Sequence, residues 1–188
     1  MFKKRVRAGR PLLGADLKLS FKCFGVSLGL MALIYLCIGV PFFGNSVLVL
    51  DLNGQYVYFF EALHNIIYDR DASLLYSFSR AMGGEFMGIF AYYLASPFNW
   101  LGFLLPEGLI MEFMSYLVIL RIGLMGLTFS IYLRKVFGKE DPAALLFSTA
   151  YALSGYLAAY NWNVMWLDSI AMLLAGGQGS RLMVLTEN

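Results

Sequence analysis

The stretch Cys23–Phe43 (CFGVSLGLMALIYLCIGVPFF) decides what kind of protein this chain can form. It runs for 21 residues without a charged side chain. At about 1.5 Å per residue, a helix of that length crosses the ~30 Å hydrocarbon core of a membrane. The composition agrees, because 60% of the residues are hydrophobic and only 14% are charged, against about 25% charged in soluble domains. We therefore expect an all-α, polytopic membrane protein.

The segment 1–22 that precedes this run is a basic leader. It holds half of the 14 lysine and arginine residues of the chain and one acid, Asp16. Basic flanks of a span stay in the cytoplasm, so we expect a cytoplasmic amino terminus and read residues 23–43 as transmembrane helix 1, a retained signal anchor. Within that helix, Gly25-x-x-x-Gly29 is a weak indication of a close contact with another helix.

The region 44–108 is predicted to be an outer loop with amphipathic and re-entrant helices. Apolar residues recur every three or four positions between Tyr56 and Ile67, a pattern typical of a helix that lies in the membrane interface. The next apolar stretch, Phe86–Leu105, is long enough to span, but Pro97 interrupts it near its middle. The charge distribution farther along the chain decides whether it crosses.

Two more spans follow the loop. Residues 109–133 are predicted to form transmembrane helix 2, and 134–142 form a basic, cytoplasmic turn. If 86–105 also crossed, that basic turn would lie outside, so we expect that 86–105 does not cross. Residues 143–168 then form transmembrane helix 3 and its outer end, and residues 169–188 form a separate glycine-rich tail.

Three charged residues are candidates for function. Asp51 is the first acid after helix 1, and Asp168 ends the third span on the same predicted face, so the two carboxylates form a candidate site. The alternative for Asp51 is a hydrated loop residue. Arg121 lies in the middle of a span, where a lone cation costs about 2.5–3.5 kcal/mol on insertion scales and must face protein or a wet cavity. It binds a lipid phosphate or a catalytic carboxylate, or it is a snorkelling or structurally paired arginine.

Several motifs carry a family resemblance that covers most of residues 15–173. Together they resemble the YfhO-type bacterial membrane proteins, and that family in turn resembles the GT-C class of polytopic glycosyltransferases. The motifs are Asp51-x-x-x-Gln55-Tyr56-x-x-Phe59, the Ser77–Gly84 segment (SFSRAMGG), Ala91–Asn99 (AYYLASPFN), and Tyr151–Tyr156 (YALSGY) with Met165–Asp168 (MWLD).

The resemblance implies a function at the bacterial plasma membrane. It implies a polyprenyl-phosphate sugar donor, transfer on the outer membrane face, and cell-envelope polymers such as teichoic acids as acceptors. Asp51 is then the catalytic or metal-associated carboxylate, and Gln55, Tyr56, Arg121 and Asp168 are the expected substrate-binding residues. A divalent cation at Asp51 and Asp168 is an alternative, and no other cofactor is expected. The expected partners are the lipid bilayer, the donor and the polymer, and not nucleic acid. Family members have more spans than this chain. We therefore expect the chain to be the amino-terminal part of such a protein and to be inactive alone.

The tail departs from this pattern. Residues 176–186 (GGQGSRLMVLT) resemble the opening of sugar-nucleotide pyrophosphorylases, especially the glucose-1-phosphate adenylyltransferases. In those enzymes the backbone N–H groups of a glycine-rich turn contact nucleotide phosphates. The matching residues are Gly176, Gly177, Gly179 and Arg181. We expect this segment to be non-functional, because it is too short to fold as a nucleotide domain, and to mark a junction from a gene rearrangement or an assembly error.

Two other functions stay open from the sequence. One is a non-catalytic membrane scaffold or lipid-handling protein, in which Asp51 is dispensable. The other is a fusion or assembly remnant of a sugar nucleotidyltransferase, which needs a domain downstream of the tail.

Overall fold

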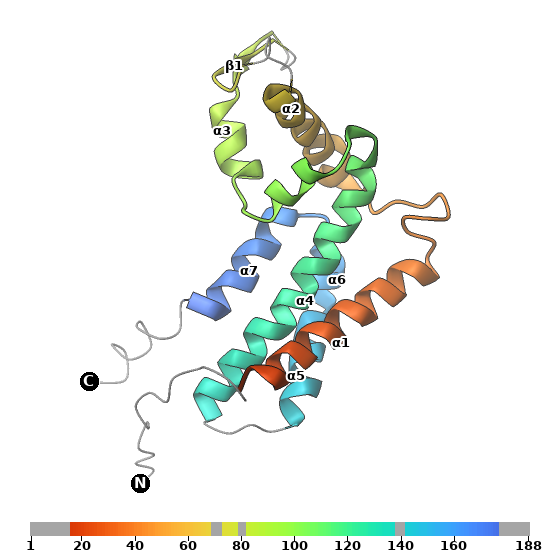
Figure 1. The fold of residues 1–188 in the computed structure, drawn as a ribbon, viewed down its shortest axis with the longest axis vertical. Coiled ribbons are helices and arrows are strands. Elements are labelled where there is room, and N and C mark those ends of the chain that lie inside the picture. The colour runs from red at the N-terminus through yellow and green to blue at the C-terminus, as the bar shows by residue number, and fades with distance from the viewer. Residues whose placement is uncertain (1–15, 69–72, 79–81, 138–141, 177–188) are drawn as a thin grey trace, which may run out of the picture.

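The computed structural model describes residues 16–68, 73–78, 82–137 and 142–176. Within these residues the chain forms a bundle of helices and, at one end of the bundle, a cap of short elements (Figure 1). The only strands among the described residues are a two-stranded antiparallel hairpin in the cap. The all-α fold expected from the composition is therefore confirmed.

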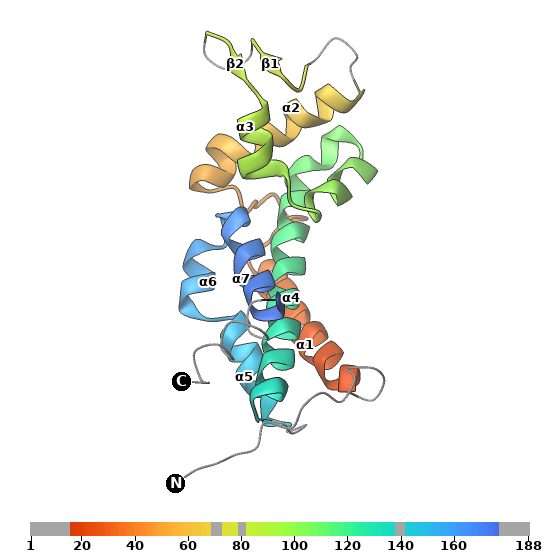
Figure 2. The same ribbon diagram turned by 90° about the vertical axis from the view of Figure 1, so that its left-hand side faces the viewer.

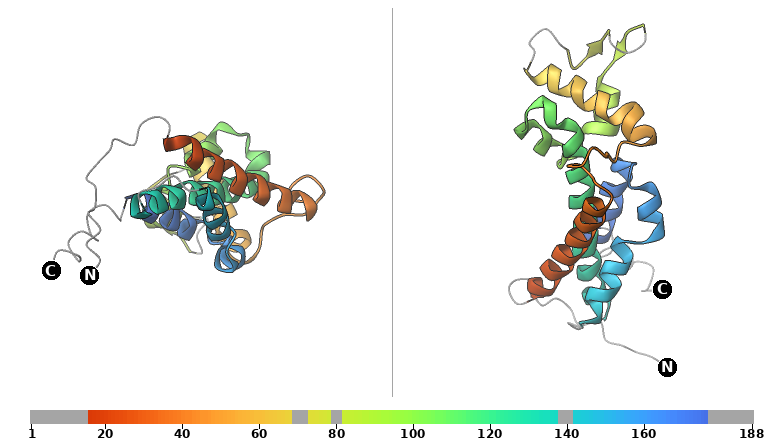
Figure 3. Two further views of the ribbon diagram at one scale, coloured as in Figure 1. Left: turned by 90° about the horizontal axis from the view of Figure 1, so that it is seen from below. Right: turned by 90° about the vertical axis from the view of Figure 1, so that its right-hand side faces the viewer.

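Five helices make up the bundle. The longest, α4, lies among the others, with α1, α5 and α7 packed around it (Figures 2 and 3). Their bounds are α1 Asp16–Cys37, α4 Ile110–Phe137, α5 Ala143–Ala152, α6 Gly155–Tyr160 and α7 Val164–Gly176.

Three stretches of the described residues are long and apolar enough to cross a membrane. They are Leu17–Cys37, Ile110–Phe137 and Ala143–Tyr160, where the third combines α5 with α6. The start of α1 and the end of α4 lie at the same end of the bundle, because Arg134 donates a hydrogen bond of 2.7 Å to the hydroxyl of Ser20. The chain is thus a polytopic membrane protein with about three spans, as predicted.

The cap lies at the opposite end of the bundle from Ser20 and Arg134 (Figure 1). Its elements are short, and two of them, η1 and η2, are π-helical turns, which are rare and are often found at functional sites. Residues 86–105, which we expect not to cross the membrane, are divided here among short helices. The elements are η1 Leu52–Tyr56, α2 Val57–Tyr68, β1 Tyr76–Ser77, β2 Gly84–Glu85, α3 Met87–Ile89, η2 Phe90–Leu94, η3 Asn99–Leu104 and η4 Glu107–Leu109.

Helix α1 ends through local chemistry before the cap begins. Gly39 adopts a φ of 80°, which glycine alone reaches without strain. Its N–H bonds to the carbonyl of Leu36 at 3.1 Å, and the N–H of Val40 bonds to that of Tyr35 at 2.8 Å. This is the Schellman pattern of a helix end. The side chain of Asn45 donates to the carbonyl of Ile38 at 2.6 Å, so the last turn is satisfied and the chain turns away.

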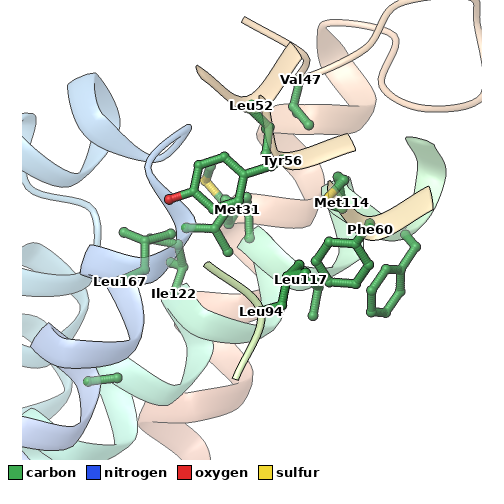
Figure 4. Packing of buried hydrophobic residues seen from close by; sticks show 14 of the residues in the cluster. Met31, Val47, Leu52, Tyr56, Phe60, Leu94, Met114, Leu117, Ile122 and Leu167 are labelled. Atoms are coloured by element: carbon green, nitrogen blue, oxygen red, sulfur yellow. The ribbon is translucent and has the colours of Figure 1, made fainter. Parts of the chain in front are cut away.

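The cap is joined to the bundle by a continuous apolar core. Leu52 and Tyr56 of η1 and Phe60 of α2 point toward the bundle, where they meet Met114 and Leu117 of α4 (Figure 4). All five side chains are buried. Burying a side chain of this size away from water is worth about 1.5–3 kcal/mol. This core holds the cap, and the site within it, in a defined position on α4.

The last helix returns into the bundle. After α6 the chain turns at residues 161–163, and α7 then runs back along α4 (Figure 2). The division predicted between residues 168 and 169 lies inside α7, so Asp168 sits in the second turn of a packed helix and not at the end of the third span. The helix continues past residue 168 because hydrophobic residues on both sides of Asp168 pack in the core. Val164, Leu167 and Ala171 are all buried.

Candidate functional site

Asp51 lies at the start of the first π-helical turn. The residue before it, Leu50, has a φ of 48°, a left-handed conformation that is uncommon for residues other than glycine. Such strained positions cost about 1–3 kcal/mol and gather at functional sites. Asp51 itself is half-buried, and its Oδ1 accepts a hydrogen bond of 3.3 Å from Nε2 of Gln55, four residues along the turn. The side chains of Asp51 and Gln55 are therefore paired within this turn.

Tyr93 of the second π-helical turn fixes the orientation of Gln55. Its hydroxyl donates to Oε1 of Gln55 at 2.8 Å, so the amide of Gln55 must present its N–H to Asp51. Burial raises the pKa of the Tyr93 hydroxyl, and the charges of Tyr92 and Asp51 raise it further, so Tyr93 stays protonated as a donor. The network Asp51–Gln55–Tyr93 thus joins η1 to η2.

Tyr56 ties this network to the last helix. Its ring is buried and meets that of Tyr93 edge-on, with centroids 5.2 Å apart. Its hydroxyl donates to Oδ1 of Asn163 at 2.8 Å, just before α7 begins. Burial raises the pKa of Tyr56 well above its usual value, which keeps the proton on this hydroxyl. In this structure Tyr56 connects the cap to α7 and is not open to a ligand.

Arg121 and Asp168 form an ion pair between α4 and α7. Nε of Arg121 lies 2.5 Å from Oδ1 of Asp168, and Nη2 lies 3.1 Å from Oδ2, so the contact is bidentate. Nη2 also donates to Oδ1 of Asn99 at 2.9 Å and to the hydroxyl of Ser96 at 3.4 Å. The ring of Phe98 lies 5.7 Å from the guanidinium carbon. One cation therefore holds α7 and the 96–99 loop of the cap together.

The exposure of the two partners differs. The Arg121 side chain is fully buried, whereas 13% of the Asp168 side chain is exposed. Nη1 of Arg121 has no hydrogen-bond partner among the described residues. Of the roles left open for Arg121, these contacts agree with the structurally paired one. It leaves the carboxylate, and not the guanidinium, facing outward.

A pocket of about 420 Å³ lies between η2 and α7. Tyr93, at the end of the Asp51 network, lines one side, and Asp168, held by Arg121, lines the other. The pocket brings together residues that are more than 70 positions apart in the sequence. Its lining is Ala91, Tyr92, Tyr93, Ala95, Ser96, Met165, Trp166, Asp168 and Ser169.

The sequence did not single out Tyr93, Ser96, Asn99 or Trp166 as site residues. The available signal was the segment Ala91–Asn99, which places polar and aromatic side chains around Pro97 inside an otherwise apolar stretch. A span that faces lipid alone has no use for such residues. Spacing could not assign partners to Tyr93, Ser96 and Asn99, because each one bonds to a side chain of another element more than 20 positions away.

The geometry gives little support to a divalent cation at Asp51 and Asp168. Among the described residues no group of three or more His, Cys, Asp or Glu side chains is placed to hold a metal ion. Both carboxylate oxygens of Asp168 contact Arg121. The predicted nucleotide-like residues Gly177, Gly179 and Arg181 lie outside the described residues, and Gly176 is the last residue of α7.

The chain is an α-helical polytopic membrane protein, because it forms a bundle of membrane-spanning helices with a cap of broken helices at one end. A family model described as bacterial membrane protein YfhO matches residues 23–174. Because the match covers most of the chain, the chain belongs to the YfhO family, which confirms the resemblance seen in its motifs. No curated protein and no solved structure matches it.

Proposed function

We propose that this chain is the amino-terminal part of a membrane glycosyltransferase. In this proposal a sugar moves from a polyprenyl-phosphate donor to a polymer of the cell envelope, of the teichoic-acid type, at the outer face of the bacterial plasma membrane. Membership of the YfhO family supports a membrane protein that works beside the lipid bilayer. The single observation that carries the proposal further is the ordered network of Asp51, Gln55 and Tyr93 beside a pocket at one end of the bundle.

Asp51 has the role of general base. As the acceptor oxygen bonds to the anomeric carbon of the sugar, the bond from that carbon to the donor phosphate breaks. The hydroxyl proton of the acceptor passes to the Asp51 carboxylate, and the polyprenyl phosphate leaves with the bonding electrons. Assistance of this kind is worth about 10²–10⁴-fold in rate. Gln55 orients the carboxylate, and Tyr93 orients Gln55.

In the alternative role, Asp51 binds a divalent cation instead of accepting a proton. An oxygen ligand at this position suits a divalent cation that neutralises the donor phosphate. Asp168, which lines the pocket, is the other acid that this alternative assigns to the cation. The cation would compete with Arg121 for Asp168, so binding would require that ion pair to open.

The test is Asp51→Asn at the matching position of a full-length family member. The change keeps the shape of the side chain and removes the charge. We expect transfer to the envelope polymer to fall by at least about 10²-fold, with the amount of protein in the membrane unchanged. Asn53→Ala, an exposed position on the same turn, serves as the control and leaves transfer near the parent rate. Transfer by Asp51→Asn near that rate would remove Asp51 from the chemistry.

The alternative is a non-catalytic scaffold or lipid-handling protein. The observation that favours this alternative is the ion pair of Arg121 with Asp168. An ion pair that only holds two helices together has a structural role and does not require a substrate. The Asp51→Asn experiment separates the two, because a scaffold tolerates the change. A role as a sugar nucleotidyltransferase would rest on residues 176–186 alone, and all of these except Gly176 lie outside the described residues.

The proposed orientation places the cap outside and the basic end inside. Lys18 and Lys22 in α1 and Arg134 and Lys135 in the last turn of α4 lie at one end of the bundle, and basic residues favour the cytoplasm. In a chain with Cys23 and Cys37 replaced by alanine, we expect an impermeant thiol reagent to label Ser73→Cys in intact cells. It should not label Lys139→Cys until the membrane is opened. The reverse labelling pattern would invert the orientation.

A further inference from the structure

The cap contains a second pocket, of about 450 Å³, outside the site described above. It lies between α2 and the segment around β1 and α3. This volume falls within the range of about 300–1,000 Å³ that is usual for small-molecule sites. Its floor is apolar, because Phe86 and Ile89 are 2% and 6% exposed. Its rim consists of side chains on one face of α2, including Tyr58, Phe59, Glu61, Ala62 and Asn65.

The polar groups of this pocket differ from those of the first pocket. In the first, Asp168, Tyr93 and Ser96 already bond to other side chains of the protein. In the second, the side chains of Glu61 and Asn65 make no hydrogen bond or ion pair with another described residue. Both are exposed at the rim. Their hydrogen-bonding capacity is therefore free for a ligand.

The chemistry of the rim suits a neutral ligand that is rich in hydroxyl groups. A carboxylate accepts hydrogen bonds from hydroxyls, an amide both donates and accepts, and a tyrosine hydroxyl does the same. The aromatic rings of Tyr58 and Phe59 offer apolar surfaces to the C–H face of a sugar ring. The charge of Glu61 disfavours a phosphate inside the pocket, because like charges repel across a short distance, so the phosphate links of a teichoic-acid polymer lie outside it.

The position of the pocket links it to the Asp51 network. The ring of Phe59, on the rim, packs against Tyr93, with centroids 5.0 Å apart. Tyr93 in turn lines the first pocket and bonds to Gln55. The two pockets are therefore separated by a pair of packed rings. A polymer unit held in the second pocket is connected to Asp51 through Phe59, Tyr93 and Gln55.

We propose that the pocket between α2 and α3 binds a neutral sugar or sugar-alcohol unit of the acceptor polymer and so presents the polymer to the Asp51 site. This inference rests on the proposed function for the identity of the acceptor. The binding itself does not depend on catalysis. The pocket therefore has to bind a soluble sugar in the absence of any donor.

The experiment measures binding of two neutral probes, maltotetraose and chitotetraose, to the whole purified chain in detergent micelles, by isothermal titration calorimetry. We expect saturable binding of at least one probe. Glu61→Gln and Tyr58→Ala each weaken that binding by at least about fivefold, the change that corresponds to the ~1 kcal/mol expected for a hydrogen bond to a charged group or for an aromatic contact. Tyr58 is 61% exposed, so the change to alanine does not open the core.

Tyr156→Ala is the matched control, because Tyr156 is also an exposed tyrosine, 52% exposed, but lies on α6 in the bundle. It leaves probe binding unchanged. The inference is overturned if neither probe binds, if choline binds in their place, or if Tyr156→Ala weakens binding as much as the pocket variants. We expect Asp51→Asn to keep full probe binding. The binding assay therefore tests the acceptor pocket, and the transfer assay tests the role of Asp51.

Discussion

The bundle and the cap are built on opposite principles. The bundle is built around two long helices, α1 and α4, whose apolar faces meet lipid or each other, and one ion pair, Arg121–Asp168, joins α4 to α7. Apart from the 12-residue helix α2 and the β1–β2 hairpin, the cap consists of short π-helical, 3₁₀ and α-helical turns, broken by Pro97 and by glycines. Regular helices satisfy their own backbone, which a bilayer requires, but they offer little freedom to aim side chains. The irregular cap carries most of the candidate site.

The two regions meet at a small number of polar contacts inside an apolar core. Arg121 reaches from α4 to Asp168 and to the 96–99 loop, and Tyr56 reaches from η1 to Asn163. If the cap is an independent unit, loss of these contacts has little effect on the bundle. If the two regions form one cooperative unit, each loss destabilises both. The following variants distinguish these cases.

The largest effect is expected for Arg121→Met. It leaves the Asp168 carboxylate in a largely buried place without its cation, which costs about 3–5 kcal/mol of unfolding free energy. The double variant Arg121→Met/Asp168→Leu recovers most of that loss, because an apolar pair of similar volume replaces the ion pair. Equilibrium unfolding in mixed detergent micelles, followed by circular dichroism, measures both. A double variant no more stable than the single one would show that the pair is not the source of the loss.

An intermediate effect is expected where α1 and α4 approach most closely. A Cβ added at Gly126 would lie 2.3 Å from Oγ of Ser27 and 2.9 Å from the carbonyl oxygen of Cys23. Gly126→Ala therefore forces the helices apart, at a cost of about 1–3 kcal/mol. Gly25→Ala is the control within the same pair of helices, since nothing lies within 4 Å of its added Cβ. Equal losses in the same unfolding assay would place the close contact elsewhere.

The smallest effect is expected for Tyr56→Phe, which removes a single hydroxyl from the junction of cap and bundle. Loss of its bond to Asn163 costs about 1 kcal/mol. Tyr68→Phe is the control, because the Tyr68 hydroxyl donates to the carbonyl of Phe103 within the cap and is exposed. We expect faster amide hydrogen exchange in η1 and at the start of α7 for Tyr56→Phe only. The same pattern in both variants would mean that neither bond joins the two regions.

The contact expected at Gly25-x-x-x-Gly29 shows why a motif alone does not locate a helix interface. Both glycines of that motif are exposed, and nothing would meet a Cβ at either one. The close approach is made on another face of α1, at Cys23 and Ser27, by a glycine of α4. Small residues permit a close contact wherever the partner helix happens to lie, and the position of the partner depends on the whole bundle.

The sequence by itself determined the class, the spans and the family. Long uncharged runs cannot avoid the membrane, and basic flanks and the broken 86–105 segment limit how the chain crosses it. It also singled out Asp51, Gln55, Arg121 and Asp168, since charged or polar residues near or inside a span are few. Only the tertiary structure decided which of them meet. Helix α7 returns along α4 and places Asp168 against Arg121, while Tyr93 becomes the partner of Gln55. Such pairings depend on where distant helices pack, which local periodicity and spacing do not encode.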